Sequence, residues 1–261
     1  MDFVVILVLL IAGALAGIVT GLVSASAVII MAPLLILVLN MNPYVAIGLS
    51  LGTDIVASIV AGRIYYKNKH VNLIPMIFFL FFTFAGITVG SYVSTFISSS
   101  DLSGVMGIAA LLTGLAFMYK KKREGNKHNG LERFRLKFKK RKELWLSIIG
   151  FLVGLNAGIF GAGGGIAILL VLVFLLGYEM HMAIGTSAVI MILMAFVGSV
   201  AHFYYEPFNF AYLGIAWIGA FFGAFYSSKF ANHISEARLR KISGAVLAVV
   251  GLLLTTKIFL W

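Results

Sequence analysis

The chain has 261 residues, of which 61% are hydrophobic and 11% are charged. Apolar runs fill nearly its whole length, which is typical of a polytopic membrane protein and leaves no room for a separate soluble domain. The absence of cysteine excludes disulfides, thiolate metal sites and cysteine nucleophiles. The first apolar run lacks the basic segment and the cleavage pattern of a secretory signal, so we expect it to be retained.

The apolar runs predict an all-α membrane protein made of two similar halves. In the first half we expect an interrupted segment over 3–39 and helices over 44–66, 73–97 and 103–119. In the second half we expect an interrupted segment over 145–176 and helices over 181–204, 209–231 and 239–259. The corresponding division is a first membrane repeat (1–119), a basic linker (120–143) and a second membrane repeat (144–261).

The two halves match each other at a fixed offset of 137 positions without a gap. In this register Gly13 meets Gly150, and AIGLS (46–50) meets AIGTS (183–187). Further matches include Asn72 with Asn209, Gly86 with Gly223, Ile97 with Ile234 and Gly107 with Gly244. An ungapped register over a whole half indicates an internal repeat.

The formal net charge of +11 is concentrated in the linker, because twelve of the twenty Lys and Arg residues lie between Lys120 and Lys142. Such a loop is cytoplasmic by the positive-inside rule, and its basic and aromatic residues could also contact anionic lipid. No nucleic-acid recognition fold surrounds it, so we do not expect nucleic acid as a partner.

The remaining basic residues predict how the halves lie in the membrane. With the linker inside, the basic turn at 63–69 also falls inside, whereas the equivalent turn of the second half, YYEPF (204–208), has no basic residue. In that half the basic residues stand instead at 229–241. We therefore predict an inverted-topology repeat with both chain termini outside.

If the halves are inverted, each interrupted segment must begin and end on the same side of the membrane, because the three full helices of a half already carry the chain to the other side. We therefore predict that each interrupted segment is a helical hairpin. Ile166–Leu176 would make ~16 Å of helix, about half the ~30 Å apolar thickness of a bilayer. The hairpin tips would be 24–28 and 161–165, and discontinuous helices of this kind build transporter sites near the midplane. The sequence leaves open whether these segments cross fully or re-enter.

Glycines dominate the second tip, and they are Gly161, Gly163, Gly164 and Gly165. Backbone without side chains allows close approach of a ligand, and the start of the following helix presents the positive end of its dipole. The tip therefore suits an anion. The alternative is close helix packing, which is the interpretation that we favour for Gly150, Gly154 and Gly158.

Small and polar residues near the tips are further candidates for the substrate path. The first tip contributes Ser24, Ser26 and Ala27, the helices after the tips contribute Ser50, Thr186 and Ser187, and Asn156 precedes the second tip. Their hydroxyl or amide groups could bind a substrate oxygen. Ser and Thr in membrane helices also bond their own backbone or a neighbouring helix, so both interpretations stay open.

Asp54 stands in the middle of an apolar helix, where a carboxylate is costly and indicates function. Protonated, it could couple transport to protons, and ionised, it could hold a cation or pair with a positive group on another helix. Its partner in the register is Met191, so the role is not symmetric. We interpret Arg63 as a residue that snorkels to the cytoplasmic surface and His202 as a packing or interfacial residue.

At these residues the chain resembles the sulfite exporter TauE/SafE family, whose members have two homologous halves with a glycine-rich segment followed by an A-x-G-T-S-like stretch. GAGGG (161–165) and AIGTS (183–187) match well, whereas the first half keeps AIGLS but has Ser24–Ala27 in place of glycines. The resemblance covers almost the whole chain. It implies movement of small sulfur-containing anions, such as sulfite or organosulfonates, usually outward.

The leading hypothesis is therefore a secondary transporter of small sulfur anions in the cell membrane, working by alternating access at a midplane site. The expected partners are the anion and the lipid bilayer, with a homodimer left open and no cofactor. A passive anion channel and a cation transporter centred on Asp54 are the alternatives. An enzyme is not expected, because the scattered histidines and single intramembrane carboxylate offer no catalytic group. The sequence has no phosphate-binding loop, so we do not expect ATP to drive transport directly.

Overall fold

In the computed structural model of the protein, residues 2–94, 141–160 and 164–259 are described, and the regular structure within them is helical. The first half contains α1 (Phe3–Val23), α2 (Val28–Leu39), α3 (Pro43–Lys67), the short 3₁₀ turn η1 (Ile74–Met76) and α4 (Ile77–Ser94). The second half contains α7 (Lys142–Phe160), α8 (Gly164–Leu170), the π-helical turn η2 (Val171–Leu175), α9 (Met180–Tyr205), α10 (Phe210–His233) and α11 (Glu236–Phe259). The helix expected over 103–119 and the linker up to 140 lie outside the described residues.

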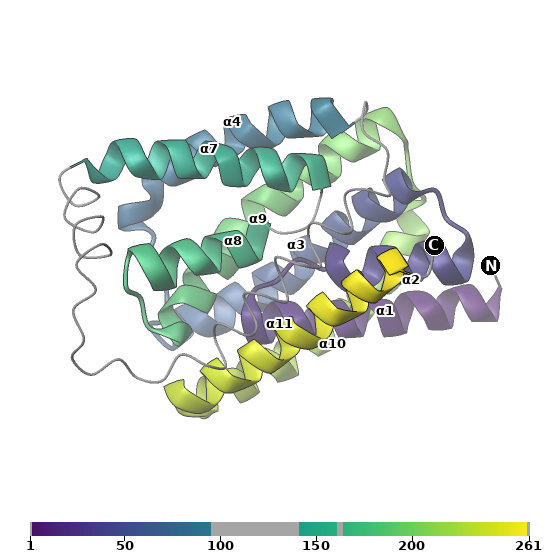
Figure 1. Ribbon diagram of the computed structural model, residues 1–261. Coiled ribbons are helices and arrows are strands. Elements are labelled where there is room, and N and C mark those ends of the chain that lie inside the picture. The colour runs from purple at the N-terminus through teal and green to yellow at the C-terminus, as the bar shows by residue number, and fades with distance from the viewer. Residues whose placement is uncertain (1, 95–140, 161–163, 260–261) are drawn as a thin grey trace.

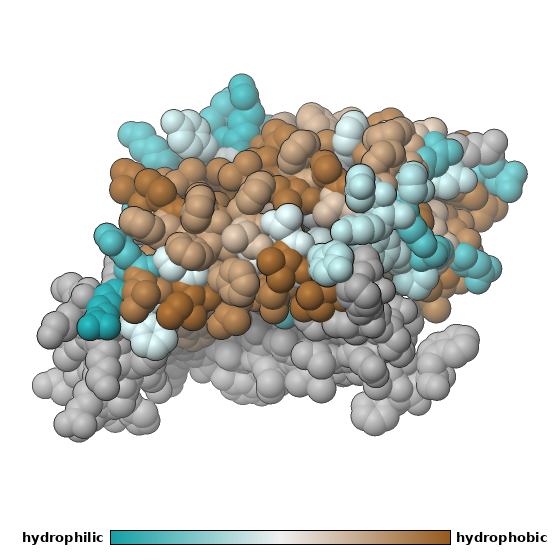
Figure 2. Space-filling view, turned by 90° about the horizontal axis from the view of Figure 1, so that it is seen from above, coloured by the Kyte–Doolittle hydropathy of each residue, from teal (hydrophilic) through white to brown (hydrophobic). Residues whose placement is uncertain are grey.

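Four of the described helices are long and apolar enough to cross a membrane by length and composition, namely α1, α3, α9 and α10. Shorter apolar helices occupy Val28–Leu39, Ile77–Val93, Glu143–Ile159 and Gly164–Leu175. The helices lie mostly along one long axis (Figure 1), and in Figure 2 apolar side chains cover the middle of the visible face while hydrophilic residues gather toward its ends. This distribution suits a molecule whose middle faces lipid.

The first expected interruption lies wholly within the described residues. Ser24 ends α1 in a left-handed conformation with φ 51°, and its N–H donates to the carbonyl of Thr20 at 2.8 Å. The chain then resumes as α2 at Val28, and residues 24–27 are called the first break below. In the second half α7 ends at Phe160 and α8 begins at Gly164, residues 161–163 lie outside the described residues, and Gly164 and Gly165 are called the second break.

Glycines bring the first helix of each half against a helix of the other half. Backbone atoms of α10 lie so close to α1 that a Cβ added at Gly13 or Gly17 would meet the carbonyl of Ala216 or Ala220, respectively. Cβ atoms added on α7 would meet α4 in the same way, Gly150 at Phe79, Gly154 at Thr83 and Gly158 at Ile87. The predicted packing role of these three glycines is thus confirmed.

These contacts follow the sequence register. Gly13 plus 137 is Gly150, and Ala216 minus 137 is Phe79, so the α1–α10 contact and the α4–α7 contact join equivalent positions. The offset found in the sequence therefore also relates contacts in space. Residue numbers rise together along each pair, so α1 runs parallel to α10 and α7 runs parallel to α4.

The helices α3 and α9 are equivalent in the register, and they pack against each other in opposite directions. A Cβ added at Gly48 would lie 3.0 Å from the Cβ of His202, and one added at Gly185 would lie 2.7 Å from the Cβ of Tyr65. These two contacts are again related by the offset, because 48 plus 137 is 185 and 65 plus 137 is 202. These two equivalent helices are therefore antiparallel.

One end of the molecule collects the basic turns. Nδ1 of His70, which follows α3, lies 2.8 Å from Oδ1 of Asn232 near the end of α10. The basic segments at 63–69 and 229–241 therefore lie at the same end, whereas α1 begins and α11 ends toward the opposite end (Figure 1).

Candidate functional site

The two breaks meet inside the protein, although 141 positions separate Ser24 from Gly165 (165 − 24). A Cβ added at Gly165 would collide with the carbonyl oxygen of Ser24, so this glycine allows the two backbones to touch. The Ser24 hydroxyl donates to Oγ of Ser187 at 3.1 Å, and the Ser187 hydroxyl donates to the carbonyl of Gly165 at 3.1 Å. Ser187 thus joins the first break, the second break and α9.

Asp54 lies in the middle of α3 and is fully buried beside the first break. Its Oδ2 lies 2.5 Å from the hydroxyl of Ser26, and its Oδ1 accepts the backbone N–H of Ala27 at 2.7 Å. Ala27 stands immediately before α2, so the carboxylate occupies the positive end of that helix. Within the described ranges, the bonds of Asp54 come from neutral donors and no cation pairs with it. The predicted pairing with a positive group is therefore not seen there.

Thr20 of α1 supports the same network, and the sequence analysis did not single it out. Its buried hydroxyl lies 3.0 Å from the carbonyl of Ala16, 3.0 Å from that of Ala25 and 3.3 Å from Oδ1 of Asp54. A hydroxyl has one proton, so Thr20 donates to one of these acceptors at a time. The available signal was its position, one turn before a break in an otherwise apolar helix.

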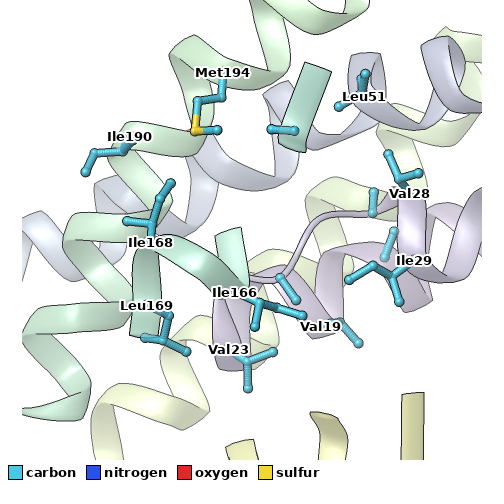
Figure 3. Close-up of a cluster of buried hydrophobic side chains, with 14 of the residues drawn as sticks. Val19, Val23, Val28, Ile29, Leu51, Ile166, Ile168, Leu169, Ile190 and Met194 are labelled. Carbon is cyan, nitrogen blue, oxygen red and sulfur yellow. The ribbon is translucent and has the colours of Figure 1, made fainter. Parts of the chain in front are cut away.

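Besides these polar contacts, two methionine side chains pack against the second break. A Cβ added at Gly164 would meet Cε of Met194 at 2.7 Å, and one added at Gly165 would lie 3.2 Å from Sδ of Met191. Met191 is the equivalent of Asp54, so a thioether stands where the other half has a carboxylate. Figure 3 shows the apolar side chains around both breaks, with Ile166 of α8 drawn close to Val19 and Val23 of α1.

The other predicted residues divide into two groups. Gly161 and Gly163 lie outside the described residues, and Asn156 is partly exposed on α7. The Ser50 hydroxyl donates to the carbonyl of Ala46 at 2.6 Å, which is the local backbone bond that competes with a binding role. Thr186 accepts the backbone N–H of Asn72 at 3.0 Å and so holds the turn before α4.

Arg63 and His202 agree with the interpretations made from the sequence. Arg63 is exposed on α3. The ring of His202 is buried and stacks on Tyr44, with 4.3 Å between ring centroids. Neither side chain contacts the breaks through an observed hydrogen bond.

A second polar cluster lies at the end of the molecule that carries the basic turns, and the sequence analysis did not identify it. Nδ1 of His181 lies 2.9 Å from Oε2 of Glu236, and Nε2 lies 3.0 Å from the carbonyl of Ala231. Glu236 also accepts the backbone N–H of Met180 and contacts Arg240. This cluster ties α9, α10 and α11 together and is separate from the breaks.

The fold and the breaks define the class of protein. Long apolar helices, two breaks that meet inside the bundle and a buried carboxylate on a central helix are the architecture of a membrane transporter. In the part of the chain that the structure describes, no group of three or more His, Cys, Asp or Glu could hold a metal ion.

Comparison with known proteins identifies the family. The chain belongs to the sulfite exporter TauE/SafE family, whose model matches residues 9–254. It is 30% identical to the probable membrane transporter protein YunE of Bacillus subtilis (strain 168) over 267 residues, which cover 96% of each chain. It is also 23% identical to the probable membrane transporter protein YdhB of the same strain, over 92% of this chain and 96% of that protein. The search of solved structures gave no significant match.

Proposed function

We propose that this protein is a secondary transporter that exports small sulfur-containing anions, such as sulfite or organosulfonates, by alternating access at a midmembrane site. The observation that carries the proposal is the meeting of the two breaks at Ser24, Ser187 and Gly165. A junction of two interrupted helices is the place where such transporters bind their substrate. The family to which the chain belongs supports the choice of a sulfur anion.

The proposed site combines the second break with the hydroxyls that reach it. Gly164 and Gly165 begin α8 and have no side chains of their own, while Ser24 and Ser187 supply hydroxyl groups. Since α8 is short, the proposal relies on this combination and not on the helix dipole alone. We propose that the two glycines not described, Gly161 and Gly163, complete the site.

Alternating access needs two halves that can exchange roles, and we propose an inverted-topology repeat with a cytoplasmic linker and external termini. The antiparallel packing of α3 and α9 at equivalent positions supports opposite orientations of the halves. The gathering of the basic turns at one end supports a cytoplasmic assignment of that end.

Transport by purified protein in liposomes tests the proposal. Vesicles that contain the protein are expected to release preloaded labelled sulfite or taurine-like sulfonates faster than protein-free vesicles of the same lipid. Electrical current and flux rate would distinguish a carrier from a passive channel. Failure to move any sulfur anion across a broad panel would refute the substrate class.

The buried carboxylate specifically favours a second candidate, a transporter of another small ion with Asp54 as its cation or proton site. The same vesicles, loaded with sodium, potassium or a pH indicator and no sulfur anion, test it. Ion flux without any anion would favour this candidate over the first.

A further inference from the structure

We propose that Asp54 binds one proton in each transport cycle and that its protonation is required for tight binding of the anion at the neighbouring junction of the breaks. This inference rests on the proposed function, because it names the coupling ion of that site. Four steps lead to it, and each depends on contacts in the described residues.

The first step is the closeness of the carboxylate to the proposed site. Ser26 contacts Asp54, and Ser24, only two positions earlier, contacts the second break through Ser187 and Gly165. Two residues of extended chain span at most about 7 Å. An anion at the junction would therefore lie near a buried carboxylate, where low effective permittivity makes repulsion between like charges strong.

The second step is that no cation from the described residues pairs with the carboxylate. The first break and α2 supply Ser26 and the N–H of Ala27, and α1 supplies Thr20. No hydrogen bond or ion pair to Asp54 is observed from the titratable and basic side chains of the packed helices in the described residues: Tyr44, Arg63, Tyr65, Tyr66 and Lys67 of α3, His181, His202, Tyr204 and Tyr205 of α9, and Tyr212, Tyr226, Lys229 and His233 of α10. Among the described residues, hydrogen bonds and the start of α2 therefore stabilise the negative charge of Asp54.

The third step is the size of the ion that fits. The oxygens around Asp54 already lie at hydrogen-bond distance, 2.5 Å for Ser26 and 3.3 Å for Thr20, and the carboxylate has no exposed surface. A proton fits between oxygens at these distances without displacing any of them. A metal ion would need these bonded oxygens to move apart.

The fourth step is the consequence for transport. Proton binding forms one O–H bond on the carboxylate and removes one negative charge, and release of the same proton to water on the other side restores it. Anion and proton therefore strengthen the binding of each other, and this coupling is reciprocal by thermodynamic linkage. The equivalent residue Met191 cannot titrate, so one proton is carried for each chain.

The test uses full-length protein and an alkyl sulfonate such as isethionate, which keeps one negative charge between about pH 5 and pH 8, unlike the titratable groups of the protein. Wild-type protein is expected to bind it about tenfold more tightly at the acidic end of this range, a typical size for coupled sites. Asp54→Asn should bind with the acidic wild-type affinity at every pH, and Asp54→Glu should keep the pH dependence. Glu206→Gln, which removes a carboxylate from the far end of α9, is the matched control and should behave as wild type.

Three results would overturn the inference. One is an unchanged pH dependence in Asp54→Asn, and another is a wild-type affinity that does not respond to pH. The third is an increase of affinity with sodium at constant pH that disappears in Asp54→Asn, because it would assign the site to a metal ion. Each of these leaves sulfur-anion transport intact, so they differ from failure of the proposed function.

An infrared measurement tests the proton site without any substrate. The difference spectrum between acidic and neutral pH is expected to contain the C=O band of a buried protonated carboxyl group in wild type and to lack it in Asp54→Asn. If wild type binds no sulfur anion, this band still decides whether Asp54 takes a proton. Its absence from the wild-type spectrum would refute the assignment.

Discussion

The two breaks occupy equivalent places in the two halves, yet they have different partners for their backbone and side-chain groups. Backbone groups freed by a break need partners in a membrane interior. The first break has its own internal anion, because Asp54 accepts the Ala27 N–H and contacts the Ser26 hydroxyl. The second break faces Met191 and Met194 and has no carboxylate among its described contacts. The comparison teaches that a buried carboxylate bonds the first break, whereas the described part of the second break packs against thioethers and the backbone of Ser24.

Gly165→Ala is the strongest way to break this comparison. The added methyl group would collide with the carbonyl oxygen of Ser24, so the two breaks would have to separate. We expect a loss of about 1–3 kcal/mol of stability, as for other overpacked sites, and loss of most sulfonate transport. The measurements are the melting temperature in detergent and flux from vesicles.

Gly214→Ala is the matched control for that experiment, because nothing lies within 4 Å of a Cβ added there. It should leave stability and transport close to wild type. Equal effects of the two substitutions would show that contact between the breaks is not needed.

Thr20→Val tests the internal bonding of the first break at nearly constant volume. The carbonyl of Ala25 and the carboxylate of Asp54 would lose a donor, and unsatisfied buried groups cost about 1–3 kcal/mol. We expect a lower melting temperature and, at neutral pH, somewhat tighter sulfonate binding, because one donor fewer holds the negative charge of Asp54. Thr88→Val is the control, because that hydroxyl is exposed and bonds only Phe84 of its own helix. A similar loss in both variants would contradict the prediction.

Ser187→Ala and Ser50→Ala sharpen the comparison, because the two residues are equivalent in the register. Ser187 contacts both breaks, whereas Ser50 bonds its own backbone at Ala46. We expect Ser187→Ala to weaken sulfonate binding about tenfold, which corresponds to about 1.4 kcal/mol, and Ser50→Ala to have a smaller effect. Titration calorimetry measures both. A larger effect at Ser50 would mean that the substrate lies nearer the first break.

Much of the fold could be predicted from the sequence. Hydropathy locates the helices from neighbouring residues alone, and the offset of 137 positions relates the two halves without knowledge of the structure. The predicted helix at 44–66 agrees with α3 at Pro43–Lys67, and the first interruption is found where small residues predicted it. We expected the two breaks to meet because we inferred that the halves are inverted. The structure shows the contact between Gly165 and Ser24. Whether the anion binds there stays a prediction.

The partners of individual side chains could not be predicted, since they depend on which helices pack together. Ser50 and Ser187 are alike in sequence context, yet only Ser187 faces another break. Asp54 was recognised as costly, but its donors come from 34 positions earlier at Thr20 and from the first break. The cluster of His181 and Glu236 joins the start of α9 to the start of α11 and left no local pattern in either segment.

The pairing of α1 with α10 and of α7 with α4 has a consequence for how the chain is assembled. The glycines of α1 pack against α10, and those of α7 pack against α4, so each of these pairs needs residues from both halves. The α4–α7 pair therefore becomes possible only once α7 has been synthesised, and the α1–α10 pair only once α10 has been synthesised.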